Sequence, residues 1–133
     1  MEIIAALFMD DIEMRSVPGP STRIDLSGIQ FSAPAPAAVP CTVAPHLVVL
    51  VWAPPDSKGT GALEVVFRPL GGDPEAEPLA RNVQPLEIEP EKFNYRLVRA
   101  ELAFEDYGTI VAHCRIDLGP VRVVPYTLLP PVQ

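Results

Sequence analysis

The sequence predicts an all-β fold: an antiparallel β-sandwich, jelly-roll or immunoglobulin/C2-like, with about eight strands. Its 17 prolines and 8 glycines are spread between apolar segments, as short strands joined by turns require. Several segments alternate apolar and polar residues with the period of two that half-buried strands show. The alternation also changes phase within single segments. This occurs where a strand bends or passes between sheets, and it favours a sandwich over a closed barrel.

The first elements are expected at the apolar start of the chain. We interpret residues 3–14 as a strand; a helix is the alternative, but no convincing N-cap precedes the segment. Residues 15–21, rich in Ser, Pro and Gly, predict a turn. A second strand follows over residues 22–32, with a bulge at Gly28 that resets its phase. Residues 33–40 alternate Ala and Pro and predict a polyproline-like connector.

The central strand is predicted at residues 46–53, His-Leu-Val-Val-Leu-Val-Trp-Ala, between Pro45 and the pair Pro54-Pro55. Both faces of this run are apolar, which is typical of a strand covered on both sides. A single covering sheet buries only alternate residues. We therefore expect Leu47, Val49 or Val51, on the second face, to meet a loop, a bent strand or another subunit.

The covering strands are predicted in the next third of the chain. After a turn over residues 54–61, residues 62–69 alternate cleanly, which indicates an antiparallel strand with one wet surface. An exposed acidic loop is expected at residues 71–78. Residues 79–89 alternate weakly and contain Pro85, which favours an edge strand.

The last strands are predicted from three further segments. Residues 93–104 form one long strand with a bulge or twist near Leu97. Residues 109–118 show the best alternation of the chain, with Cys114 on the inward side and His113 on the outward side. Residues 121–128 contain Pro125, which again suggests an edge.

Length and charge limit the functions to consider. A chain of 133 residues fits one domain, residues 1–133. A net charge of -7 disfavours nucleic acid and anionic membranes as partners, because both need clustered Lys and Arg. The start of the chain lacks the basic region of a signal peptide, so we expect a cytoplasmic protein with Cys41 and Cys114 reduced.

Three short motifs carry a resemblance to a group of bacterial proteins. They are the start Met-Glu-Ile-Ile-Ala-Ala-Leu-Phe-Met-Asp-Asp, the turn Leu-Ala-Phe-Glu-Asp-Tyr-Gly at residues 102–108 and the ending Val-Pro-Tyr-Thr-Leu at residues 124–128. The chain resembles a family of short bacterial proteins of unknown function that look like β-sandwiches. The resemblance implies a fold, but it brings no activity, cofactor or catalytic residue.

Motifs for chemistry are weak. The chain has no nucleophile elbow, no metalloprotease motif and no phosphate-binding glycine loop. A small hydrolase would have to use Glu87 with Glu89, or Glu101 with Glu105. A C2-like site for a divalent cation would use carboxylates of two segments, and a zinc site the soft ligands. These candidates are Asp10, Asp11, Glu13, Asp73, Glu75 and Glu77 for a hard cation, and Cys41, His46, His113 and Cys114 for zinc.

We therefore predict a non-catalytic binding or assembly module without a cofactor. The mean hydropathy of the chain is positive, which is high for an acidic soluble monomer. Apolar surface that the fold does not bury often marks an oligomer interface. We expect a protein partner or a homodimer. The candidate interaction surface consists of Trp52, Pro54, Pro55, Tyr107 and Tyr126.

Overall fold

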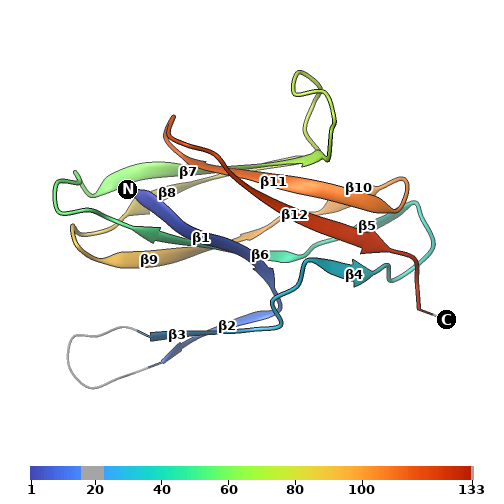
Figure 1. Ribbon diagram of the computed structural model, residues 1–133, viewed down its shortest axis with the longest axis horizontal. Coiled ribbons are helices and arrows are strands. Elements are labelled where there is room, and N and C mark those ends of the chain that lie inside the picture. The colour runs from blue at the N-terminus through green and yellow to red at the C-terminus, as the bar shows by residue number, and fades with distance from the viewer. Residues whose placement is uncertain (16–22, 133) are drawn as a thin grey trace.

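The computed structural model describes residues 1–15 and 23–132, and this part of the chain is all-β (Figure 1). It contains twelve strands and no helix, so the predicted all-β class is confirmed and the strand count of about eight is wrong. The strands are β1 (Glu2–Met9), β2 (Asp11–Arg15), β3 (Arg23–Ser27), β4 (Ser32–Pro34), β5 (Cys41–Val43), β6 (His46–Trp52), β7 (Thr60–Pro69), β8 (Ala80–Glu87), β9 (Phe93–Arg99), β10 (Leu102–Phe104), β11 (Gly108–Ile116) and β12 (Arg122–Leu129).

The strand β6 is the centre of a three-stranded antiparallel sheet with the order β1-β6-β9. This confirms the predicted central strand at residues 46–53. Its core side is formed by Leu47, Val49 and Val51, none of which has exposed surface. These were the residues expected on the second face. The face opposite the core instead carries Val48 and Leu50, because side chains alternate along a strand.

A five-stranded sheet supplies the other side of the core, in the order β4-β12-β11-β7-β8. All its pairings are antiparallel except that of β4 with β12. β8 is an edge strand, as Pro85 predicts. β12 was also predicted at an edge, yet it lies between β11 and β4. Pro125 is tolerated there because β4 pairs only with Thr127, Leu128 and Leu129, which leaves that side of Pro125 without a partner strand.

Two predicted elements divide where the chain changes direction. The long strand over residues 93–104 separates into β9 and β10, with the break after Arg99 and not at Leu97. β10 pairs with β5, a short strand that the sequence did not indicate. The predicted connector at residues 33–40 begins as the end of β4 and turns before a cis Val39–Pro40 bond.

The N-terminal segment forms two strands, so the interpretation of residues 3–14 as extended chain is confirmed. β1 carries a bulge between Ile3 and Ala5, and β2 pairs with β3 in a hairpin that extends away from the larger sheets (Figure 1). The turn predicted at residues 15–21 falls, after Arg15, outside the described residues. Gly28 follows β3 at a φ of +69°, where the backbone of Asp10 donates hydrogen bonds to the carbonyl groups of Ser27 and Gly28.

The core lies between the two larger sheets, which curl toward each other. Side chains bridge them where β8 and β9 approach: the amide of Gln84 donates to the carbonyl of Leu97 over 3.0 Å, and the guanidinium of Arg96 reaches the carbonyl of Pro85. The ring of Phe8 packs on that of Tyr126, with centroids 5.0 Å apart. Among the largest fully buried side chains are Phe8, Leu47, Leu63, Phe67, Leu102 and Leu128.

Candidate functional site

The outer face of the three-stranded sheet is an apolar surface that the strand registers place outside the core. Phe8, Leu47 and Val98 form one row across the sheet and belong to the core cluster. The neighbouring rows therefore point away from the core. Between Glu2 at one end and His46 at the other, this surface, here called the β6 face, consists of Ala5, Leu7, Val48, Leu50, Trp52, Phe93, Tyr95 and Leu97, together with the exposed Ile4 at the β1 bulge beside Ala5.

Exposure is higher at the margins of the β6 face than at its centre. At its margins, Ile4 is 52% exposed and Leu97 42%. Val48 has no exposed surface, since Leu7 and Leu97 flank it in the same row and are larger. Leu50 is half-buried at the centre. The face is thus apolar and continuous, and water reaches its outer layer.

The charged residues of this surface lie only at its corners. Glu2 pairs across the sheet with Trp52 at one end, and Arg99 pairs with His46 at the other. Because Glu2 lies on β1 and Arg99 on β9, these two opposite charges occupy diagonal corners. Both are exposed, and neither has an ion-pair partner among the described residues.

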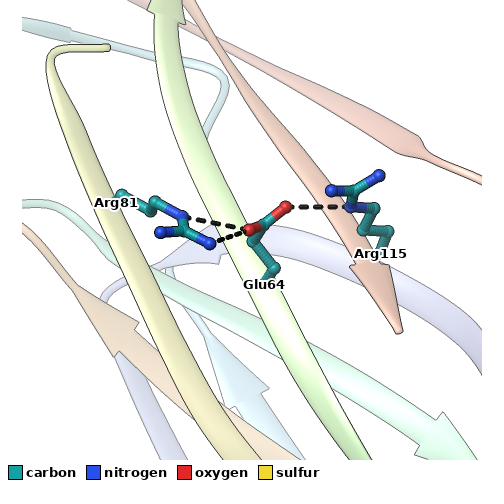
Figure 2. A network of polar contacts seen from close by, with 3 residues as sticks. All are labelled: Glu64, Arg81 and Arg115. Atoms are coloured by element: carbon teal, nitrogen blue, oxygen red, sulfur yellow. Dashed lines mark hydrogen bonds and ion pairs between the residues drawn. The ribbon is translucent and has the colours of Figure 1, made fainter. Parts of the chain in front are cut away.

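A second feature lies on the outer face of the five-stranded sheet. Glu64 of β7 accepts a hydrogen bond from Nε of Arg115 on β11, over 2.8 Å, and from Arg81 on β8 (Figure 2). The side chain of Glu64 is only 17% exposed. The hydrogen bond from Arg81 is the main cause that lowers the pKa of this carboxyl, and Arg115 adds to it.

Burial raises the pKa of two groups in the core. It raises the pKa of the Cys114 thiol to about 12, because a thiolate would lose its hydration there. It also raises the pKa of the Tyr126 hydroxyl, with a smaller contribution from the charge of Asp10. Both groups are therefore neutral at physiological pH and act as parts of the core.

The predicted interaction residues are not brought together. Trp52 lies at one end of the β6 face and is half-buried. Pro54 and Pro55 follow it in a turn closed by the hydrogen bond from Ser57 N to Pro54 O. Tyr107 is half-buried against the core in the turn before β11. Tyr126 corrects the prediction: only 3% of its surface is exposed, because it points inward from β12 and stacks on Phe8.

The candidates for metal binding and hydrolysis remain dispersed. In residues 1–15 and 23–132, no group of three or more His, Cys, Asp and Glu side chains is placed to hold a metal ion. Cys114 faces the core whereas His113 faces outward, as the alternation predicted. The four glutamates considered for a hydrolase, Glu87, Glu89, Glu101 and Glu105, are all exposed.

Sequence reasoning missed most of the β6 face. Residues 93–104 were predicted as a strand, but the sequence did not indicate that Tyr95 and Leu97 lie beside Leu50 and Val48. That alignment depends on the pairing of β6 with β9, which lie more than forty positions apart. The apolar character of both faces of residues 46–53 was the signal that pointed to this surface.

Comparison with known proteins found no family, no curated protein and no solved structure that matches this chain. The resemblance to short bacterial proteins therefore stays a prediction. Within the part of the chain that the structure describes, there is no helix long and apolar enough to cross a membrane.

Proposed function

We propose that this protein is a non-catalytic assembly module in which the β6 face binds a second copy of the chain. The observation that carries the proposal is the uncovered apolar surface across β1, β6 and β9. In a monomer, Ile4, Leu50 and Leu97 keep apolar area in water, and a second copy would remove it.

The charges at the corners support a symmetric pair. In a face-to-face dimer, a two-fold axis parallel to the sheet and perpendicular to the diagonal between Glu2 and Arg99 exchanges those corners. Glu2 of each copy then meets Arg99 of the other, which gives two ion pairs at the rim. Such an isologous contact is the commonest arrangement in homodimers. These ion pairs would determine the relative orientation of the two sheets, and they would add little to the affinity of the dimer.

The area of the β6 face limits the expected affinity of the dimer. Three strands about 4.8 Å apart, each advancing about 3.3 Å per residue over the length of β6, give a footprint of about 330 Å². A standard interface buries about 800 Å² on each partner. The β6 face is less than half of that size, so we expect a weak dimer that dissociates on dilution.

Three finer assignments belong to the same proposal. We propose that the curled sheets form a sandwich-like scaffold, that the protein is cytoplasmic, and that it belongs with the short bacterial proteins that it resembles. The cation-binding and hydrolase alternatives stay predictions; in residues 1–15 and 23–132, no three His, Cys, Asp or Glu side chains are grouped to hold a metal ion.

The fluorescence of Trp52 tests the proposal, because it is the only tryptophan of the chain and lies on the β6 face. We expect its emission to shift to longer wavelength on dilution from tens of micromolar to tens of nanomolar. The double variant Ile4→Lys with Leu97→Lys should show the dilute spectrum at all concentrations. Both positions are already exposed, so the variant should fold.

The matched control is Val83→Lys on β8, where the valine is 53% exposed but lies on the other sheet. This variant should keep the concentration dependence of the unmodified protein. A spectrum of the unmodified protein that does not change with concentration would contradict self-association through this face.

A further inference from the structure

A groove crosses the outer face of the five-stranded sheet, on the side away from the core. Its floor is formed by outward side chains of β7, β11 and β12, and its wall by the start of the loop between β7 and β8. It encloses about 580 Å³, which lies within the range of small-molecule sites. Its apolar lining includes Val66, Leu70, Val111, Val121 and Val123.

One end of the groove carries an arginine that is held in place but not saturated. Nε of Arg115 donates to Glu64 over 2.8 Å, and in Figure 2 the contact between these two residues runs through Nε, with neither terminal nitrogen joined to the carboxylate. Among the described residues, these terminal nitrogens have no hydrogen-bond acceptor. A guanidinium fixed through Nε and open at its terminal nitrogens can still donate to a carboxylate.

The charge of Glu64 does not cancel this arginine, because Arg81 shares the same carboxylate. Arg68 lies four residues after Glu64 on β7, lines the groove as well, and donates to the carbonyl of Ala76 in the loop. The lining therefore has a surplus of positive charge in a chain whose net charge is -7. This local reversal is the charge complement of an anion.

Acidic residues of the loop limit how many charges the ligand can carry. Asp73, Glu75 and Glu77 are exposed beyond the lining of the groove. They would repel an extended polyanion such as an acidic peptide or a nucleic acid. A short molecule with one anionic end and an apolar body avoids them and matches the lining.

We propose that this groove binds a small amphiphile with a single carboxylate. The carboxylate receives hydrogen bonds from the terminal nitrogens of Arg115, and the apolar body lies on Val66 and Val123 between the sheet and the loop. This binding is independent of self-association, because the groove and the β6 face lie on the outer sides of different sheets.

Octanoate is a suitable probe, followed by amide shifts in two-dimensional NMR of the full chain. We expect saturable shifts that map to β7 and β11. Acetate has the same carboxylate without the tail, and octylammonium has the same tail with a positive charge. Both should bind at least tenfold more weakly than octanoate.

Two variants test the assigned contacts. Arg115→Gln should weaken octanoate binding at least tenfold, whereas Arg99→Gln, on the other sheet, should not change it. Val123→Glu places a negative charge in the groove at a position 54% exposed, and should also weaken binding. Its matched control is Leu129→Glu, on the same strand, 43% exposed and outside the lining.

Three results would overturn the proposal. The first is the absence of octanoate shifts in β7 and β11, or shifts confined to the β6 face. The second is octylammonium binding as tightly as octanoate, which would indicate apolar adsorption only. The third is unchanged octanoate affinity in folded Arg115→Gln and Val123→Glu proteins.

Discussion

Val48 and Val49 are adjacent in β6 and both lack exposed surface, yet they face opposite sides of the three-stranded sheet. Val49 belongs to the core cluster between the two larger sheets. Val48 is outside that cluster and lies between Leu7 and Leu97 in the same row of the sheet. A central strand with two apolar faces thus contributes one face to the core and directs the other away from it, where we propose that assembly takes place.

Truncation of these two valines to alanine should lower the free energy of unfolding by different amounts. Val49→Ala leaves a cavity in a closed core and should lower the free energy of unfolding by about 2 kcal/mol. Val48→Ala should cost about 1 kcal/mol, since its neighbours can relax and water can reach the space. Urea denaturation at submicromolar protein concentration measures both. A loss at Val48 as large as that at Val49 would mean that the β6 face is closed in the monomer.

Glu64→Gln should destabilise the protein in a pH-dependent way. The folded pKa of Glu64 is lowered from its ordinary value of 4.5, so its charge stabilises the fold at higher pH. This contribution is lost as the pH falls through the folded pKa. We expect a cost of about 1 kcal/mol at pH 7, in the range for partly exposed pairs. The stability difference between the two proteins should shrink as the pH falls below 4.5, and a difference that stays constant under acidic conditions would exclude the carboxylate as the cause.

The two cysteines should differ in reactivity. Both are free; Cys41 is half-buried, and Cys114 is buried with its pKa raised to about 12. Since the thiolate is the reactive form, Cys114 should resist a disulfide reagent at pH 8 while the protein is folded. We expect one rapidly reacting thiol per chain at most in the native state and two in denaturant. Rapid reaction of Cys114 in a folded Cys41→Ser variant would show that β11 opens readily.

Gly28→Ala should destabilise the junction between β1 and the β2–β3 hairpin. The backbone there has a φ of +69°, and an added Cβ would lie 2.2 Å from Oδ2 and 2.8 Å from Cβ of Asp10. We expect a loss of about 2 kcal/mol from the strained conformation and the displaced Asp10. Thermal unfolding measures it. Gly71→Ala also has a positive φ but no atom within 4 Å, so it should cost less; equal losses would assign the effect to φ alone.

Local patterns predicted the fold class and several strands for clear physical reasons. Alternation over residues 62–69 and 109–118 corresponds to β7 and β11, whose inward side chains fill the core. Proline placed β8 at an edge. The same prediction from Pro125 was wrong for β12. The strand β4 pairs with β12 but is too short to reach Pro125, so the local sequence of β12 resembles that of an edge strand.

The candidate site was less predictable because it depends on pairing between distant segments. The two apolar faces of β6 were visible in the sequence, and they indicated that something must cover the second face. Which residues share that face follows from the registers with β1 and β9, which no local pattern specifies. Tyr126 shows the converse: an aromatic residue near a chain end resembles a surface contact until its partner Phe8 is known.

Sedimentation equilibrium of the unmodified protein tests the central claim most directly. We expect the average mass to rise from the chain mass of 14.4 kDa at submicromolar concentration toward twice that value at a few hundred micromolar. The Ile4→Lys and Leu97→Lys double variant should stay at the chain mass throughout, and exchanging Glu2 for Arg together with Arg99 for Glu should preserve the dimer. A mass of 14.4 kDa for the unmodified protein over the whole range would contradict the account.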